Sequence, residues 1–522
     1  MKTMPSFAEK PFNATRGLIP LLVFWAILCV GLVLRLTGHF SGRLSLDELV
    51  TRQFAMRDSL TALWTAGLSE PTPPVFDTFA HLAWLLFGDS PESLRIPSLL
   101  FGMLILPIVF WTVRWGGFKR SDSLGAMAVA AVSSVLIYYS QEVRPYSMLA
   151  LTGVMSVGLL LRCLQKTTRL NLALFTISVI IVPHTHRYGL LLLPAEFICI
   201  VLYRQWKLLK WFIAGSMVVG LLLVLHIAAG NFTFAESWER TTSWASPLYL
   251  INMLNVGTIK LPFLQVHQPS PLVAYPASWA NLAISLSGLT VFSLAFYTGL
   301  ANIKTYSAQQ KQTIIVLLLC VGVPAVLALL AGSPMSPKPQ WLLRGLIFTC
   351  PLYSAAAVAL VSSSRFKLWF IMGMIIINLF STNAYYRHFS RFSFIGAFEY
   401  LNKKTSENDI ILASPWYLYE AINYYYRGPA QKAAYVPKVG WIDLRKLRES
   451  NNPFYTSSLP LAIETPVVKG TAYFFWTIQC RDSLAPFAGN AIFVFDTQSE
   501  SFWKRIDRET GWPPGRLKPC SD

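Results

Sequence analysis

Long apolar stretches recur along this chain of 522 residues. No charged residue lies between Arg16 and Arg35, between Arg95 and Arg114, or from Leu272 to Ile303. A run of about 18 apolar residues is long enough to cross the hydrocarbon core of a bilayer as a helix. The pattern predicts eleven membrane-spanning helices, at 17–35, 95–114, 123–140, 146–162, 170–184, 188–203, 211–229, 275–300, 312–331, 345–362 and 368–385.

One further apolar segment, "VFDTFAHLAWLLF" at 75–87, has two interpretations. It is short, contains Asp77 and His81, and follows two prolines. If it crossed the membrane, the basic loops that follow would lie on the opposite side. We therefore expect an interfacial helix with its apolar face on the membrane; the alternative is a short, tilted span.

The composition agrees with a membrane protein. Only 13% of the residues are charged and 54% are hydrophobic, whereas soluble proteins carry about 25% charged residues. The net charge of +18 would suit a nucleic-acid partner, but the basic residues form short clusters between apolar segments. This distribution follows the positive-inside rule and places the N-terminus in the cytoplasm. We therefore expect no nucleic-acid partner, and an uncleaved first helix, because no small-residue cleavage site follows it.

The last part of the chain has a different character. "NDIILASP" and "GNAIFVFDT" have the pattern of short strands, and "WYLYEAINYYYR" that of an aromatic-rich helix. The sequence thus predicts a polytopic α-helical membrane domain at 1–389 and a small α/β domain at 390–522, on the extracytoplasmic side. Whether Cys480 and Cys520 form a disulfide there stays open; the other five cysteines fall in or beside apolar segments.

Two acids directly follow the first predicted span. "RLSLDELVTRQFA" brings Asp47 and Glu48 into the first extracytoplasmic loop, 38–94, near the membrane surface. Carboxylates at such a place can act as general bases. The alternative is an ordinary solvated loop in which Ser45 or Asp47 caps a helix.

The next extracytoplasmic turn also carries charges. In "YYSQEVRPYSM", Glu142 and Arg144 lie between two predicted spans, in a turn too short to reach far into water, and Tyr146 follows. Charges at that depth are costly and usually mark a functional site or an ion pair. A purely structural pair between Glu142 and Arg144 is the alternative.

Two later loops add cations and rings on the same side. "PHTHRYG" contributes His184, His186 and Tyr188, for which hydrogen bonding is a commoner role than metal binding in a turn. "SPMSPKPQWLLRG" contributes Lys338 and Arg344, against the general charge bias. An anionic lipid phosphate would explain them, because lysine and arginine are the usual phosphate partners.

With these motifs the chain resembles a known family, the GT-C-fold glycosyltransferases, in the branch of the protein O-mannosyltransferases and the lipid A aminoarabinose transferase. The resemblance covers about residues 40–150 best. It runs in order through "SLDE", "PTPPVF", "LLFGDSPESLRIPSLLFG" and "YYSQEVRPYSML". Later, "HTHRYGLLLL" and "SPKPQWLLRG" look like further landmarks. Two positions depart from the family pattern: Thr72 replaces a basic residue, and Gly345 replaces a tyrosine after Arg344.

The resemblance implies a polyprenyl-phosphate sugar as donor and a lipid, glycan or protein as acceptor. It makes Asp47 the catalytic base, with Glu48 and Glu142 as further catalytic candidates. It implies donor-phosphate or substrate binding by Arg144, Tyr146, His184, His186, Tyr188, Lys338 and Arg344. It further implies inversion at the anomeric carbon. Whether a divalent cation assists stays open, and the sequence indicates no other cofactor.

The family also suggests a multi-pass protein of the bacterial inner membrane that modifies an envelope glycan or lipopolysaccharide. Two alternatives remain open. A non-catalytic lipid or glycan transporter would carry polar residues in the midplane of the bundle, such as Glu196 and His226. A glycan polymerase or ligase would share the donor chemistry but use an oligosaccharide.

Overall fold

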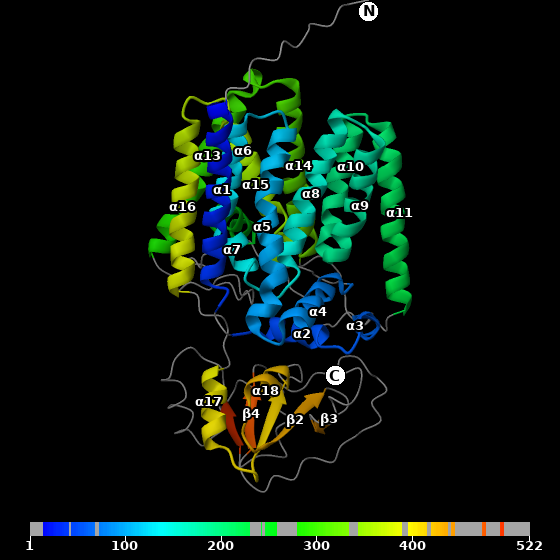
Figure 1. The fold of residues 1–522 in the computed structure, drawn as a ribbon, viewed down its shortest axis with the longest axis vertical. Helices are drawn as coiled ribbons and strands as arrows, with labels where there is room; N and C mark the ends of the chain where they lie inside the picture. Colours follow the sequence, from blue (N-terminus) through cyan, green and yellow to red (C-terminus); the bar gives the residue numbers. More distant parts are fainter. Residues whose placement is uncertain are drawn as a thin grey trace, which may run out of the picture.

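The computed structural model describes residues 14–40, 43–67, 73–229, 242, 246–257, 279–333, 343–388, 395–414, 419–436, 440–443, 472–476 and 491–494. A bundle of long helices forms the larger part, and a small sheet domain lies beyond one end of it (Figure 1). The first half of the bundle contains α1 (Ala14–Thr37), α2 (Leu46–Ala55), α3 (Leu60–Gly67), α4 (Val75–Phe87), α5 (Pro91–Trp115), α6 (Arg120–Val132), α7 (Ser134–Tyr139), α8 (Tyr146–Gln165) and α9 (Arg169–Thr185).

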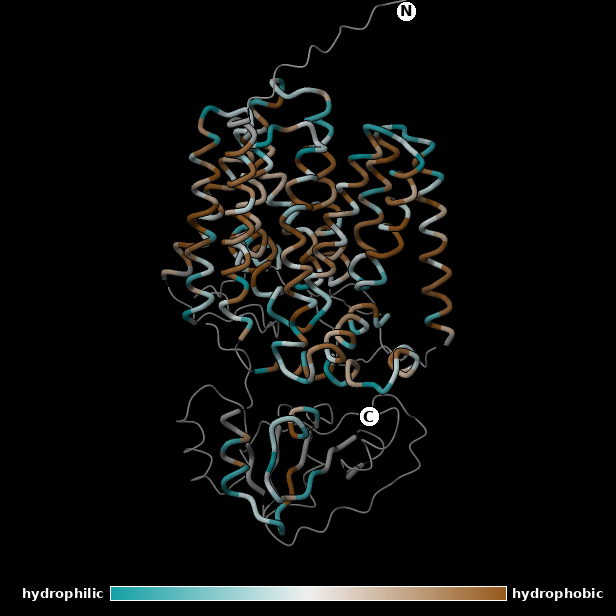
Figure 2. The backbone as a smooth tube through the Cα atoms, viewed as in Figure 1, coloured by the Kyte–Doolittle hydropathy of each residue, from teal (hydrophilic) through white to brown (hydrophobic). Residues whose placement is uncertain are grey.

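The second half continues the bundle and leads into the sheet domain. It contains η1 (Arg187–Leu191), α10 (Leu192–Leu202), α11 (Trp206–Ala229), α12 (Ser246–Val256), α13 (Trp279–Ala301), η3 (Ile303–Thr305), α14 (Ala308–Ala331), η4 (Leu343–Leu346), α15 (Thr349–Val361) and α16 (Lys367–His388). Apolar residues occupy the middle of these helices and polar residues gather near their ends (Figure 2), as a bilayer requires.

Seven helices of the described residues are long and apolar enough to span a bilayer: Leu18–Thr37, Pro91–Trp115, Tyr146–Gln165, Trp206–Ala228, Leu282–Ala301, Ala308–Ala331 and Lys367–Arg387. The other four expected spans are shorter or interrupted. The helix α9 has 17 residues, and the segment 123–140 is divided into α6 and α7 at the extended Ser133. The segments 188–203 and 345–362 lie mainly in α10 and α15, which follow the 3-10 turns η1 and η4. Length alone therefore does not establish these four as crossings.

The helix α4 coincides with the apolar segment 75–87. With α2 and α3 it lies at the end of the bundle, between the long helices and the sheet domain (Figure 1). Phe79, Leu82, Leu85, Leu86 and Phe87 are exposed on it. An exposed apolar face at the end of a bundle suits a helix lying in the membrane interface, so this location supports the interfacial interpretation.

The C-terminal domain is a five-stranded sheet in the order β3-β2-β1-β4-β5, parallel except for the antiparallel pair β2–β3. Its elements are α17 (Ile395–Lys404), β1 (Ile410–Ser414), α18 (Tyr419–Tyr425), β2 (Gln431–Val436), β3 (Gly440–Asp443), β4 (Ala472–Trp476) and β5 (Ala491–Val494). The strands β1 and β5 and the helix α18 coincide with the three segments that the sequence indicated. Cys480 and Cys520 lie outside the described residues.

Two hydrophobic clusters hold the molecule together. The larger one fills the helix bundle. The second joins the loop after α1 to the C-terminal domain, because Leu44 and Leu49 share it with Phe398 and Ile422. The sheet domain is thus packed against the segment that carries Asp47.

The arrangement of the two ends predicts a pattern of cysteine accessibility. In a variant without native cysteines, Asp58→Cys and Asn402→Cys should react with an impermeant maleimide on intact cells, because both residues lie at the end that carries the sheet domain. Lys166→Cys and Lys304→Cys should react only after permeabilisation. All four side chains are exposed. Labelling of position 58 and position 402 from opposite sides would contradict the fold.

Candidate active site

The helix α2 begins with a capping box. The Ser45 hydroxyl accepts a hydrogen bond from the Glu48 amide at 3.4 Å, and the Ser45 amide donates to Glu48 Oε2 at 2.8 Å. This reciprocal pair satisfies two backbone donors that a helix N-terminus otherwise leaves unpaired. Of the two caps that the sequence allowed, Ser45 is the one observed, and Asp47 falls in the first helical turn.

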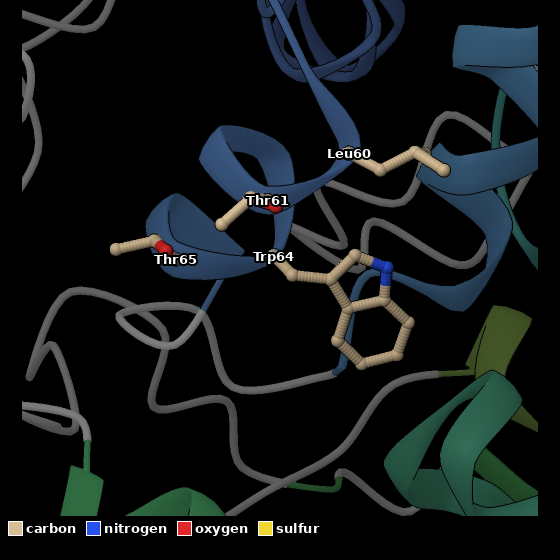
Figure 3. Close-up of a pocket in the computed structure, with 4 residues that line it drawn as sticks. All are labelled: Leu60, Thr61, Trp64 and Thr65. Atoms are coloured by element: carbon tan, nitrogen blue, oxygen red, sulfur yellow. The ribbon is translucent and has the colours of Figure 1, made fainter.

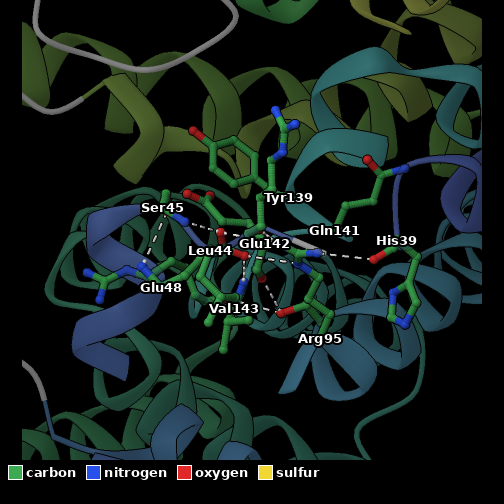
Figure 4. A network of polar contacts seen from close by, with 12 residues as sticks. His39, Leu44, Ser45, Glu48, Arg95, Tyr139, Gln141, Glu142 and Val143 are labelled. Atoms are coloured by element: carbon green, nitrogen blue, oxygen red, sulfur yellow. Dashed lines mark hydrogen bonds and ion pairs between the residues drawn. The ribbon is translucent and has the colours of Figure 1, made fainter. Parts of the chain in front are cut away.

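Glu48 is a buried junction between three segments. Its side chain and that of Arg95 on α5 are at most 1% exposed, and Arg95 Nε lies 3.1 Å from Glu48 Oε1. The same oxygen accepts a hydrogen bond from the Val143 amide at 3.0 Å, so the second extracytoplasmic turn is attached as well (Figure 4). Arg95 also donates to the backbone carbonyls of His39, at 3.1 Å, and Arg43.

Asp47 is oriented differently from its neighbour. Its side chain is 28% exposed, and Oδ2 lies 2.6 Å from Nη1 of Arg344, whose side chain is 7% exposed. Arg144 approaches the same turn, donating to the Asp47 carbonyl at 3.3 Å and to the Thr51 hydroxyl at 3.2 Å. Two arginines from distant loops therefore surround the one acid of the pair that is open to solvent.

Glu142 lies in the same site with one oxygen unsatisfied. The Tyr138 hydroxyl donates to Oε1 at 3.4 Å, whereas Oε2 is buried and has no hydrogen-bond partner. Burial raises the pKa of Glu142 to about 7, helped by the nearby charge of Glu48 and opposed by Arg344. Glu142 and Arg144, both among the described residues, do not form the structural ion pair considered from the sequence, since Arg144 turns to α2.

Three buried polar atoms around Asp47 have no hydrogen-bond partner: Glu142 Oε2, Arg144 Nε and Arg344 Nε. Buried polar groups are nearly always hydrogen-bonded, so unsatisfied ones need an explanation. A polar ligand beside Asp47 would supply both the acceptors that the arginines need and the donor that the glutamate needs.

Aromatic side chains line the other side of the cluster. The rings of Tyr139 and Tyr146 lie 4.8 Å apart, those of Tyr146 and His186 5.6 Å, and those of His186 and Tyr188 5.8 Å, measured between centroids. The Arg344 guanidinium lies 5.3 Å above the Tyr146 ring. The three aromatic residues proposed from the sequence here, Tyr146, His186 and Tyr188, thus stand together with Arg344.

Gly345 owes its identity to this packing. A Cβ at this position would lie 2.4 Å from Cγ of Tyr188, a distance that real atoms do not reach. The Tyr188 ring therefore occupies the space in which a side chain at position 345 would begin.

The two histidines have different environments. His186 Nδ1 accepts a hydrogen bond from the Tyr188 amide at 3.2 Å, and burial lowers its pKa well below the usual range, assisted by the charge of Arg187. The Nδ1 atom of His184 instead lies 2.7 Å from the Ile180 carbonyl oxygen, one helical turn earlier on α9. Lys338, the second expected phosphate ligand, lies outside the described residues.

Arg95 and Asp77 were not among the residues proposed from the sequence. The signal for Arg95 was its place in "SPESLRIP", as a cation at the extracytoplasmic end of an apolar span. Asp77 interacts electrostatically with Arg144, and burial raises its pKa to about 6 although Arg144 opposes the rise. For a metal, the described ranges contain no group of three or more His, Cys, Asp or Glu side chains suited to hold an ion.

A shallow hollow lies beside the site on α3. Leu60, Thr61, Trp64 and Thr65 line it (Figure 3). The Trp64 indole N–H donates to the Thr78 hydroxyl of α4 at 3.1 Å, which fixes the ring between the two helices. These residues are apolar or neutral, so the hollow itself offers no charged group.

Comparison with known proteins defines the class of this architecture. No family model and no curated protein matches the sequence. Among solved structures, ArnT from Cupriavidus metallidurans in the apo state is 12% identical over 80% of this chain and 86% of that chain, with a TM-score of 0.50. The chain is therefore a polytopic membrane protein with the GT-C fold.

Two more solved structures were found. ArnT from the same organism bound to undecaprenyl phosphate is 11% identical over 78% of this chain and 85% of that chain, with a TM-score of 0.49. The Archaeoglobus fulgidus oligosaccharyltransferase in its apo form is 11% identical over 81% of this chain but 64% of its own, with a TM-score of 0.47. At these identities the likeness concerns the fold alone.

The buried pair Glu48–Arg95 predicts a large effect on stability. Arg95→Met leaves the Glu48 carboxylate buried without its cation, a change that typically costs about 3–5 kcal/mol. The matched control is Arg52→Met, because Arg52 pairs with Asp89 where the side chains are 17% and 33% exposed. Its loss should cost no more than about 2 kcal/mol, including the contact with Tyr424. Denaturant unfolding in detergent measures both; equal losses would contradict the role of burial.

The raised pKa of Glu142 predicts a pH dependence of stability. The folded state favours the protonated carboxyl. The contribution of Glu142 to the free energy of unfolding is therefore complete below pH 4.5, its ordinary pKa, and is lost as the pH rises to the folded-state pKa of about 7. Glu142→Gln should remove this loss and unfold at a higher temperature than wild type at pH 8. Melting curves from pH 4.5 to pH 8 test this. A smaller dependence should remain, because the pKa of Asp77 is about 6; unchanged profiles would contradict the assignment.

Proposed function

We propose that this protein is a membrane glycosyltransferase that moves a sugar from a polyprenyl-phosphate donor to a lipid, glycan or protein acceptor. The observation that carries the proposal is the Asp47–Arg344 pair at the end of the bundle, surrounded by buried polar atoms that lack partners. The GT-C fold and the motifs "SLDE" and "YYSQEVRPYSML" support the same conclusion.

The donor phosphate is assigned to Arg344 and Arg144. Arg344 is buried and Arg144 is half-buried, and each has a buried Nε without a hydrogen-bond partner. Two fixed cations would stabilise the negative charge that grows on the phosphate as it leaves. The rings of Tyr146, His186 and Tyr188 offer faces on which the sugar can pack. Lys338 remains a proposed further ligand of the phosphate.

Asp47 is the proposed general base. It takes the proton of the acceptor hydroxyl while the acceptor oxygen forms a bond to the anomeric carbon. The bond between that carbon and the phosphate oxygen breaks, and polyprenyl phosphate leaves with the electron pair. In the structure Arg344 holds Asp47; a bound phosphate would compete for this arginine and release the carboxylate, which is a stronger base without its cation.

Glu48 and Glu142 receive separate roles. Both oxygens of Glu48 are engaged, by the Ser45 amide, the Val143 amide and Arg95. We therefore assign Glu48 to positioning, and not to proton transfer as the sequence alone suggested. Glu142 keeps a free oxygen directed at the site, so it is proposed to bind a hydroxyl of the acceptor or of the sugar.

The site is proposed to face away from the cytoplasm, in the bacterial inner membrane. The basic clusters lie in the loops at the other end of the bundle, as the positive-inside rule expects of a cytoplasmic face. Donors with an isoprenoid tail reach such a site from within the bilayer. An envelope glycan or lipopolysaccharide at that surface is the proposed class of acceptor.

One buried acid speaks for the alternative of a transporter. Glu196 on α10 is fully buried and accepts a hydrogen bond from the Ser156 hydroxyl at 2.6 Å; Ser178 donates to Ser156 in turn. A carboxyl inside a membrane bundle is a candidate for function. We favour sugar transfer, because the acids and cations gather around Asp47. The hydrogen bond described for Glu196, in contrast, comes from a neutral hydroxyl, that of Ser156.

The central test is Asp47→Asn in membranes supplied with donor lipid. Loss of the general base should lower kcat by about 10²–10⁴-fold. Glu196→Gln is the matched control, since it keeps an acceptor for Ser156 and should transfer normally. Mass spectrometry of surface glycolipids and glycoproteins measures the product. Undiminished transfer by a normally expressed Asp47→Asn variant would overturn the assignment, and loss in Glu196→Gln alone would favour the transporter.

A further inference from the structure

Three consecutive tyrosines have different environments: Tyr424 and Tyr425 end α18, and Tyr426 directly follows it. The Tyr424 ring lies under the Arg52 guanidinium, 4.7 Å from its centroid. The Tyr426 hydroxyl contacts the Thr405 hydroxyl at 2.6 Å and accepts from the Ala430 amide at 2.8 Å, so it stays within the C-terminal domain. The Tyr425 hydroxyl crosses to the first extracytoplasmic loop.

Tyr425 binds both polar groups of one peptide residue. Its hydroxyl accepts a hydrogen bond from the Leu44 amide at 2.9 Å and donates one to the Leu44 carbonyl at 2.8 Å. The ring stacks on Phe398, with centroids 5.8 Å apart and planes 17° apart. Burial raises the pKa of Tyr425 to about 12, so the hydroxyl keeps the proton that it donates.

Leu44 is the residue that needs this partner. It directly precedes the N-cap Ser45, outside any helix or strand, and its side chain is fully buried. Buried backbone groups that no helix or strand satisfies must be satisfied otherwise. On one side Arg95 binds the carbonyls of His39 and Arg43; on the other, Tyr425 binds both groups of Leu44.

We propose that the C-terminal domain, through Tyr425, fixes the entry of α2 and so determines where the Asp47 carboxylate stands. Tyr425 is thus a positioning residue that acts through Leu44 and Ser45. The inference rests on the proposed function for its catalytic consequence. The contacts between Arg52 and Tyr424 and between Arg52 and Asp89 hold the far end of the same helix.

The test compares Tyr425→Phe with Tyr426→Phe in the full-length protein in lipid nanodiscs. Both variants remove one hydroxyl from neighbouring tyrosines, but only the Tyr425 hydroxyl reaches Leu44. In Tyr425→Phe, amide hydrogen exchange should become about three- to tenfold faster in a peptide covering residues 43–49. This factor corresponds to the net stabilisation that one hydrogen bond typically contributes. Tyr426→Phe should leave this peptide unchanged, with faster exchange confined to the C-terminal domain.

The second measurement is transfer from the donor lipid. Tyr425→Phe should lower kcat by about three- to tenfold with the donor KM unchanged, because the base is displaced and the phosphate site is intact. Tyr426→Phe should keep the wild-type kcat. A purely structural role would raise exchange throughout the bundle and lower the amount of folded enzyme without changing kcat per folded molecule.

The outcomes separate this inference from the proposed function. Unchanged exchange at residues 43–49 in Tyr425→Phe would overturn the inference whatever the activity. Faster exchange there with wild-type kcat would also overturn it. If the wild-type protein transfers no sugar, the proposed function fails, and the exchange measurement still decides whether Tyr425 holds the entry of α2.

Discussion

The candidate site depends on one buried carboxylate, that of Glu48. Burying an ion is costly unless its charge and lone pairs are satisfied, and Glu48 is satisfied by groups from three separate segments: the helix entry at Ser45, Arg95 of α5 and the Val143 amide. Because each of these must be in place, the loop after α1 and the turn between α7 and α8 cannot move independently. The exposed Asp47, one residue earlier, takes its position from this junction.

Adjacent acids can therefore have opposite roles. A helix turns about 100° per residue, so Glu48 faces the protein and Asp47 faces Arg344 and solvent. The environment, and not the residue type, separates an acid used for support from one available for chemistry. The same separation applies to the arginines, since the hydrogen bonds described for Arg95 all go to the first loop, whereas Arg144 and Arg344 each retain a buried nitrogen without a partner.

The sequence predicted the parts whose physics is local. Apolar length marked the long helices, and period-two patterns marked β1 and β5. The sequence did not predict the helix breaks at Ser133 and before α10 and α15. Short helices pack inside a bundle as apolar segments, and average hydropathy does not distinguish them from one continuous helix. Charges in extracytoplasmic loops indicated Asp47, Glu142, Arg144 and Arg344, which the fold does bring together. The sequence alone could not predict that Glu48 is buried and Asp47 exposed. This difference depends on Arg95, which pairs with Glu48 from 47 positions away.

The C-terminal domain belongs to the same argument. The loop that carries Asp47 has little core of its own, and the second hydrophobic cluster supplies one by joining Leu44 and Leu49 to Phe398 and Ile422. The sheet domain therefore completes the folding unit that contains α2. The sheet domain accordingly lies beyond the end of the bundle that carries α2 (Figure 1), with α18 packed against α2: without that surface, the backbone entering α2 would be held from the side of Arg95 alone.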